Sequence, residues 1–217
     1  MKILSVSDEE SGLVYSTQIA SRFRGTDLAI SCGDLPNHYL DYMVSMLNVP
    51  LYFVHGNHVS VADESRPCGG TNLHRQVKYD PHSGLLLAGI EGSIQYNFGR
   101  YQYSQEEMWF LAWGLSLSLM RNKMRFGRYL DVLVTHAPPW HIHDADDRPH
   151  QGIKAFNWLI RVYQPALHLH GHVHLYRQDA IRETLVGGTR VVNTYGYRFT
   201  TLELTPPPKQ GKPNQAG

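Results

Sequence analysis

The sequence has few cysteines and no long apolar run, and each absence excludes a class of protein. Cys32 and Cys68 are the only cysteines among 217 residues, too few for the disulfide framework of a small secreted domain. The most apolar stretch, 108–120, contains glycine and serine and is shorter than the roughly 18–20 residues that cross a bilayer. The apolar part of the N-terminus is shorter than the core of a secretory signal. We therefore expect a cytoplasmic protein with reduced thiols.

An excess of charge is also missing. Lys and Arg number 20 against 19 Asp and Glu, which gives a formal net charge of +1. No basic stretch has the composition of a nucleic-acid-binding surface, so we expect no nucleic-acid partner. The chain is 42% hydrophobic and long enough to bury one core, which predicts a single domain over 1–204. Residues 205–217 are rich in proline and lack apolar periodicity, as is typical of a disordered tail.

Histidine, in contrast, is abundant. The chain has 13 histidines, many of them beside Asp, Gly or Pro between Asp131 and His174. Clustered imidazoles favour a metal site.

Short apolar segments alternate with stretches of helical spacing, and this alternation predicts a layered α/β fold. The expected strands are Lys2–Ser7, Leu28–Ser31, Leu51–His55, Leu85–Ile90, Val132–Thr135 and Leu167–His170. The expected helices are Val14–Phe23, Tyr39–Leu47, Gln105–Met124 and Gly152–Tyr163. Ser104 and Glu107 form a capping-box pattern that predicts the start of the longest helix.

After His174 the apolar segments become close-set, with Gly187-Gly188 as a turn signal. They predict a terminal antiparallel meander. Its strands would be Leu175–Ile181, Thr184–Val186, Arg190–Asn193 and Phe199–Leu204.

Five polar blocks each follow one of the predicted strands. They are Asp8-Glu9-Glu10, Gly33-Asp34, Gly56-Asn57-His58, His136-Ala137-Pro138-Pro139 and Gly171-His172-Val173-His174. Loops beyond the carboxyl ends of strands in α/β sheets converge on one crevice, so these blocks are expected to form one site. A pair of divalent cations needs carboxylates, other oxygen ligands and imidazoles, and the blocks supply all three. The glycines are expected to permit tight turns with unusual backbone angles.

In order and spacing, the blocks resemble the motifs of the calcineurin-like metallophosphoesterase superfamily: D-x-H, G-D, G-N-H-[D/E], a His before Pro-rich residues, and G-H-x-H. The resemblance covers Lys2 to about Leu204. It implies a β-sandwich flanked by helices, with the metal site at the carboxyl ends of the strands. The implied ligands are Asp8, the residue at 10, Asp34 and His174 for a first ion, and Asn57, His136 and His172 for a second, with Asp34 bridging both ions. His58 matches the family's histidine that faces the substrate.

Two positions depart from the family pattern. Glu10 stands where the family usually has His, and Val59 where it usually has Asp or Glu. A carboxylate still binds a divalent cation and favours harder ions, so we expect two divalent ions, with Mn²⁺ preferred over Mg²⁺, Fe²⁺ or Zn²⁺. The alternative for Glu10 is a solvated acid.

The resemblance implies a phosphoesterase in which hydroxide formed between the two cations attacks phosphorus and His58 acts as an acid. A small phosphodiester or phosphomonoester is the expected substrate. His38, Arg148 and His150 are further candidates for substrate contact, although each could equally belong to a solvated loop.

Two other classes of function compete with this interpretation. A non-catalytic scaffold remains open because of the change at position 10. A structural zinc protein is disfavoured because closed zinc sites use Cys and His at local spacing, which is absent here. The sequence does not indicate the oligomeric state.

Overall fold

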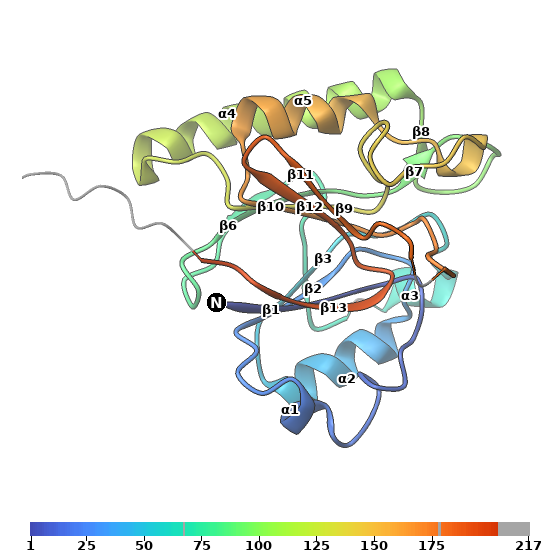
Figure 1. Cartoon of the computed structure of the whole chain (residues 1–217), viewed down its shortest axis with the longest axis vertical. Coiled ribbons are helices and arrows are strands. Elements are labelled where there is room, and N and C mark those ends of the chain that lie inside the picture. Colours follow the sequence, from blue (N-terminus) through green and yellow to red (C-terminus); the bar gives the residue numbers. More distant parts are fainter. Residues whose placement is uncertain (67, 178, 204–217) are drawn as a thin grey trace, which may run out of the picture.

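The computed structural model describes residues 1–66, 68–177 and 179–203. Two β-sheets pack face to face, and helices cover the outer face of each sheet (Figure 1). This arrangement confirms the predicted layered α/β fold. The proposed tail, 205–217, lies outside the described residues, and within them no helix is long and apolar enough to span a membrane.

The first sheet contains five strands. In spatial order they are β13 (Gly196–Thr201), β1 (Lys2–Ser7), β2 (Leu28–Ser31), β3 (Leu51–Phe53) and β4 (Thr71–Asn72). The strands β1 to β4 run parallel, and β13 is antiparallel to β1. Helices α1 (Ile19–Arg22) and α2 (Asn37–Leu47) lie against the outer face of this sheet, while the short α3 (Val61–Ser65) follows β3 in the chain.

The second sheet contains six strands. In spatial order they are β11 (Glu183–Val186), β12 (Thr189–Asn193), β10 (Leu167–His170), β9 (Val132–Thr135), β6 (Leu86–Ile90) and β5 (Val77–Tyr79). Its four central strands are parallel and its two edge strands antiparallel. Helices α4 (Gln105–Phe126) and α5 (Lys154–Tyr163) cover its outer face. A small pair, β7 (Ser93–Ile94) and β8 (Gln102–Tyr103), lies near the 3₁₀ turn Arg148–His150.

Alternation along the strands builds three apolar layers. In β9, Val132 and Val134 face the layer between the sheets, whereas Leu133 packs under the outer helices. In β1, Ile3 points between the sheets and Leu4 points towards α2. Strands covered on both faces read as continuous apolar runs, which is why the sequence located them well.

The N-terminus of α4 agrees with its prediction. The Ser104 side chain accepts a hydrogen bond from the Glu107 N–H, and the Glu107 carboxylate accepts one from the Ser104 N–H. This capping box places the start of the helix at Gln105.

The predicted C-terminal meander is wrong. Only β11 and β12 form a hairpin; β12 lies parallel to β10, and β13 crosses to the other sheet beside β1. Val191 and Val192 are both buried, so β12 is covered on both faces, which an isolated meander would not provide. The Gly187-Gly188 turn is confirmed.

Two local predictions also need correction. The described residues of 175–181 form no strand, and Tyr176 and Ile181 are exposed, so their apolar side chains have no sheet face to pack on. The helix predicted at Val14–Phe23 shortens to Ile19–Arg22 because turns occupy the preceding residues.

Candidate metal centre

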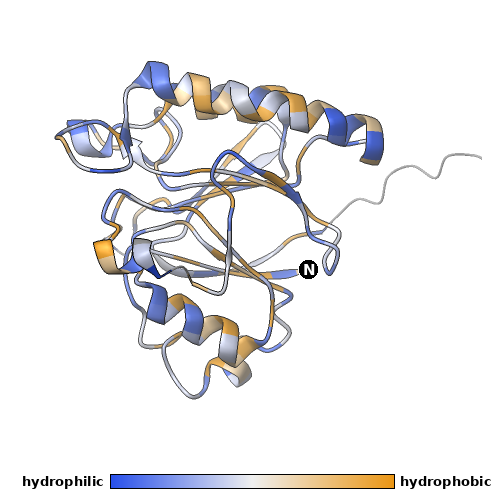
Figure 2. Cartoon of the chain, turned by 180° about the vertical axis from the view of Figure 1, so that it is seen from behind, coloured by the Kyte–Doolittle hydropathy of each residue, from blue (hydrophilic) through white to orange (hydrophobic). Residues whose placement is uncertain are grey.

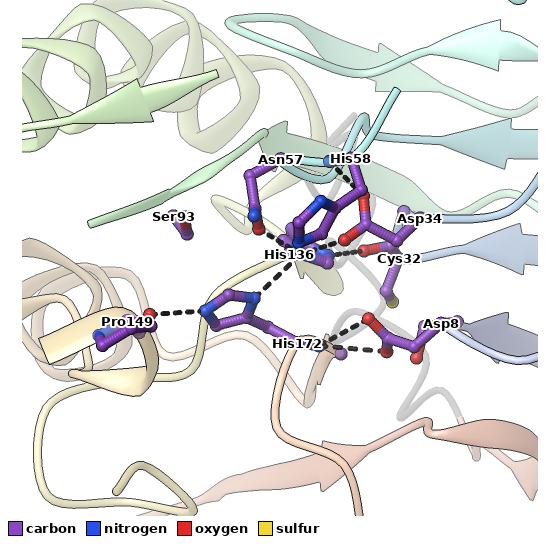
Figure 3. A network of polar contacts seen from close by, with 12 residues as sticks. Asp8, Cys32, Asp34, Asn57, His58, Ser93, His136, Pro149 and His172 are labelled. Carbon is purple, nitrogen blue, oxygen red and sulfur yellow. Dashed lines mark hydrogen bonds and ion pairs between the residues drawn. The ribbon is translucent and has the colours of Figure 1, made fainter. Parts of the chain in front are cut away.

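Five polar side chains meet where the parallel strands of both sheets end. Asp8, Asp34 and Asn57 follow β1, β2 and β3 in the first sheet, and His136 and His172 follow β9 and β10 in the second. Figure 3 shows them pointing toward a common centre from the two sheets. The predicted convergence of blocks is thus observed for these five residues.

The backbone at this centre is strained. Asp8, Asp34 and His172 adopt φ values of 64°, 56° and 69°, in the left-handed region that costs non-glycine residues free energy. The backbone N–H of His172 donates to both Asp8 oxygens at 3.0 and 3.1 Å, and this contact ties the two sheets together. Strain of this kind persists only where surrounding contacts hold it, and it is concentrated at functional sites.

The predicted unusual backbone angle is found at Gly33, whereas Gly56 and Gly171 have a different role. Gly33 has a positive φ of 102°, but Gly56 and Gly171 have no positive φ. A Cβ on Gly56 would lie 2.0 Å from Asp34 Oδ1, and one on Gly171 would lie 2.6 Å from Asp8 Oδ2. These two glycines are needed because the carboxylates pack directly against their backbone.

His136 is the hub of the centre and is fully buried. Its Nε2 lies 3.1 Å from Asn57 Oδ1, 3.2 Å from Asp34 Oδ2 and 3.1 Å from His172 Nδ1. Three potential ligand atoms from three other strand ends therefore lie within 3.2 Å of His136 Nε2.

Hydrogen bonds at the far side of each ring fix which atoms carry lone pairs. His136 Nδ1 lies 2.8 Å from the Cys32 carbonyl oxygen, and His172 Nε2 lies 2.7 Å from the Pro149 carbonyl oxygen. A carbonyl only accepts, so each of these nitrogens donates, and the opposite nitrogens, His136 Nε2 and His172 Nδ1, are left facing each other. The Asn57 amide nitrogen likewise donates to the Tyr96 hydroxyl at 3.1 Å, which turns its oxygen toward His136. Outer hydrogen bonds of this type orient metal-binding side chains.

The resulting group of lone pairs requires a cation. Burial would lower the pKa of His136, but the Asp34 and Asp8 carboxylates raise it to about 9. Burial would raise the pKa of Asp34, but the charge and hydrogen bond of His136, with the His58 N–H, lower it to about 2. Burial and the charge of His136 lower the pKa of His172 to about 3. At neutral pH the proton on His136 therefore supplies the positive charge that the neighbouring acceptor atoms need. A metal ion bound at this place would supply that charge instead and would contact several of these atoms at once.

The donor set fits divalent metal. Ligand atoms of Asp8, Asp34 and His136 lie within 4.8 Å of one another, and Asn57 and His172 add an amide oxygen and an imidazole nitrogen. Burial raises the pKa of Asp8, partly offset by the charge of His136, as expected for a carboxylate that needs a nearby cation. Mixed carboxylate, amide and imidazole ligands suit Mn²⁺, Fe²⁺ or Zn²⁺.

Glu10 and His174 make other contacts. The Glu10 carboxylate lies 3.3 Å from His38 Nε2, and both side chains are well exposed. His174 Nδ1 is 2.8 Å from the Tyr176 hydroxyl, and its ring stacks on Tyr195. Within the described chain, neither residue joins a cluster of three potential ligands. Their assignment to a first ion stays a prediction.

His58 lies at the mouth of the centre. Its backbone N–H donates to Asp34 Oδ1 at 2.9 Å, whereas its side chain is exposed. His58, Asp34 and Val59 line a cavity of about 220 Å³ whose walls also include Leu35 and Phe53. Of the five converging side chains, only Asp34 lines this cavity, so the cavity adjoins one side of the centre.

The three candidates for substrate contact are placed differently. His150 lies nearest: its ring centroid is 5.2 Å from that of His172, and its Nδ1 donates to Asp147 at 2.7 Å. Arg148 donates to the Gln95 carbonyl. His38 pairs with Glu10. Their contact with substrate stays a prediction.

Sequence reasoning missed the residues that orient the ligands. Cys32 and Pro149 act through backbone carbonyls, which no side-chain pattern reports. Tyr96 lies in a segment without a motif. The contact between Asp147 and His150, which packs beside His172, joins residues three apart in the sequence. This spacing is the one sequence signal that points to such a contact.

Comparison with known proteins identifies the family to which the chain belongs. The sequence model of the calcineurin-like phosphoesterase family matches residues 1–176, and the chain belongs to this family. No curated protein matches it. The crystal structure of TT1561 of Thermus thermophilus is similar with a TM-score of 0.58 and 16% identity, covering 90% of this chain and 89% of that one. A second solved structure has a TM-score of 0.62 and 17% identity, covering 91% and 93%. At these identities the likeness confirms the fold.

Proposed function

We propose that this protein is a phosphoesterase that uses two divalent metal ions, Mn²⁺ foremost, to hydrolyse a small phosphodiester or phosphomonoester in the cytoplasm. The observation that carries the proposal is the gathering of Asp34, Asn57 and His172 around His136 Nε2, with ligand atoms of Asp8, Asp34 and His136 within 4.8 Å of one another. Membership of the calcineurin-like phosphoesterase family supports it.

The residues divide into those that hold metal and those that meet substrate. His136, Asn57 and His172 would hold one ion and Asp8 the other, with Asp34 shared between them. Glu10 and His174 would have to turn to reach the second ion. When bound, such a pair acidifies water, grips phosphoryl oxygens and offsets charge in the transition state. Hydrogen bonds from the outer nitrogens of His136 and His172 to the protein keep their inner nitrogens unprotonated and aimed once metal is bound.

His58 is the proposed general acid. Its side chain is exposed at the cavity beside Asp34, and its backbone is fixed by the Asp34 carboxylate. An imidazole in this place can reach the leaving oxygen of a substrate held at the metal centre. An ester with a poor leaving group benefits most, because its departing oxygen needs a proton.

The test is hydrolysis by chelator-treated protein reloaded with single metals. Substrates are p-nitrophenyl phosphate, bis-p-nitrophenyl phosphate, and 2′,3′- and 3′,5′-cyclic nucleotides. Activity should be lost with chelator and return with Mn²⁺, and His172→Ala should remain inactive under both conditions. A folded protein that binds two ions and hydrolyses none of these esters would instead favour the scaffold function.

A further inference from the structure

The outer face of α4 carries an apolar seam that the described part of the chain leaves uncovered. The seam consists of Phe110, Trp113, Leu117, Met120 and Met124, and each side chain is between 53% and 81% exposed. Figure 2 shows apolar colour along the middle of this long helix and hydrophilic colour toward its ends. The inward face is already occupied, because Met108, Ala112, Leu115 and Leu119 are buried against the second sheet and α5.

The spacing of the seam matches a helix–helix contact. Its five residues recur at intervals of three, four, three and four, which is the a/d pattern of an interhelical seam. Scattered exposed apolar residues are ordinary on a protein surface, but a heptad series over most of a 22-residue helix is not scattered. A second helix of similar length is therefore the partner that could pack along this seam.

The charges of α4 indicate which helix that is. Its acidic residues, Glu106 and Glu107, lie in the first turn, and its basic residues, Arg121, Lys123 and Arg125, lie near its end. Residues 108–120 carry no charge. A second copy of α4 packed antiparallel brings each acidic turn beside a basic turn, whereas a parallel copy sets like charges together, which is destabilising.

The seam is also symmetric in the way that a two-fold pair requires. Leu117 lies at its middle, with Phe110 seven residues before it and Met124 seven residues after it. An antiparallel pair centred on Leu117 therefore places Phe110 of each copy against Met124 of the other. A shallow groove of about 320 Å³, lined by Glu106, Trp109, Phe110 and Trp113, lies where that Met124 would enter.

The area is sufficient for a specific dimer. Large apolar side chains bury about 150–250 Å² each when fully covered, so the exposed parts of these five amount to roughly 600 Å² per chain. Specific interfaces bury about 800 Å² per partner, and the polar rim of a helix pair would supply the remainder. An exposed apolar patch of this size is at the upper end of what monomeric proteins show, and such patches are often functional.

We propose that this protein forms a two-fold homodimer through antiparallel packing of α4 against α4, centred on Leu117. The interface is an isologous contact on the outer helical layer and leaves the proposed metal centre open. It does not depend on the proposed enzymatic function.

Light scattering coupled to size-exclusion chromatography, over a concentration series, tests the proposal. The wild type should have the mass of two chains, and Leu117→Glu should have the mass of one with an unchanged circular dichroism spectrum. The matched control is Leu185→Glu, a similarly exposed leucine on β11, which should remain a dimer. A wild type that stays monomeric throughout the series, or a Leu117→Glu variant that stays dimeric, would overturn the proposal.

The orientation has its own test. Leu117→Cys should form an intermolecular disulfide on oxidation because the two copies meet at this residue, while Leu185→Cys should not; the native Cys32 and Cys68 are buried. Phe110→Cys should cross-link to Met124→Cys in a mixture and not to itself, and self-linking of Phe110→Cys alone would overturn the antiparallel arrangement. Binding of a monomeric wild type to phosphatidylcholine–phosphatidylglycerol vesicles, lost in Leu117→Glu, would assign the seam to a membrane surface instead.

Discussion

The two sides of the metal centre are built differently. On the closed side, His136, Asn57 and His172 are buried, and each is oriented by a hydrogen bond to its outer atom. On the open side, Glu10 and His174 are held by His38 and Tyr176 on the surface. The closed side is oriented as a metal site would be, whereas Glu10 and His174 would have to exchange existing contacts to hold an ion. The two ions should therefore differ in affinity, with the open-side ion bound more weakly.

Loss of Asp34 should have the largest effect because the proposed function makes this residue a ligand of both ions. Asp34→Asn removes the carboxylate that faces His136 at 3.2 Å, and with it the proposed link between the ions. We expect turnover to fall by about 10³-fold or more, as for loss of a ligand central to metal catalysis, and bound metal to fall well below two per chain. Activity assays and metal analysis measure both. Asp179→Asn, a similar change at an exposed ion pair, is the control; near-normal metal content in Asp34→Asn would remove Asp34 from the centre.

Substitution of His58 distinguishes residues that bind metal from residues that contact the substrate. His58→Ala should retain both ions and lose about 10²- to 10⁴-fold in rate, the range for a positioned acid. The deficit should shrink for esters with good leaving groups because their oxygen needs no proton. Rates across a leaving-group series, with metal content measured in parallel, give the answer. A loss of metal equal to that of His172→Ala would contradict the role.

The closed side should also bind metal in a pH-dependent way. The pKa of His136 is raised to about 9, so without metal this ring is protonated at neutral pH, and the proton must leave when an ion binds. His172, whose pKa is lowered to about 3, and Asp34, lowered to about 2, have no proton to lose there. Metal affinity should therefore rise up to about tenfold per pH unit toward about pH 9 and then level. Calorimetry in buffers of different ionisation enthalpy should detect the released proton, and an affinity independent of pH over this interval would contradict it.

The sequence predicted the positions of the strand ends at the centre better than the directions of the side chains on its open side. Buried parallel strands read as apolar runs, so the strand ends that carry Asp8, Asp34 and His136 were located within a residue or two. The sequence could not show which sheet a strand joins, so β12 and β13 were misassigned to one meander. Nor could it show the direction of a side chain: Glu10 and His174 follow strands as the other candidate ligands do, but their contacts with His38 and Tyr176 depend on the folded arrangement of the loops.

Substitution of the tyrosines that contact Asn57 and His174 tests the difference between the two sides directly. Tyr96→Phe removes the hydroxyl that accepts from the Asn57 amide, and affinity for the closed-side ion should fall about tenfold, the lower range for loss of an orienting partner. Tyr176→Phe removes the contact that holds His174, so it should leave that affinity unchanged and strengthen the open-side ion. Metal titration of both variants is the measurement. Equal losses in the two would mean that the sides are not built differently.

The smallest effect is expected at Glu10, the predicted ligand position where this chain departs from the family pattern. Its carboxylate must leave His38 to reach an ion, and since both side chains are exposed, that ion pair contributes at most about 1 kcal/mol, so the exchange is feasible. Glu10→Ala should weaken the open-side ion a few-fold and spare the closed-side ion. Glu10→His should keep two ions but shift the open side toward Zn²⁺, since imidazole replaces a hard oxygen ligand. His38→Ala is the matched variant: it frees Glu10 and should strengthen the open-side ion. Anomalous scattering at metal edges assigns each ion, and unchanged occupancy and metal identity in all three variants would leave Glu10 a surface acid outside the centre.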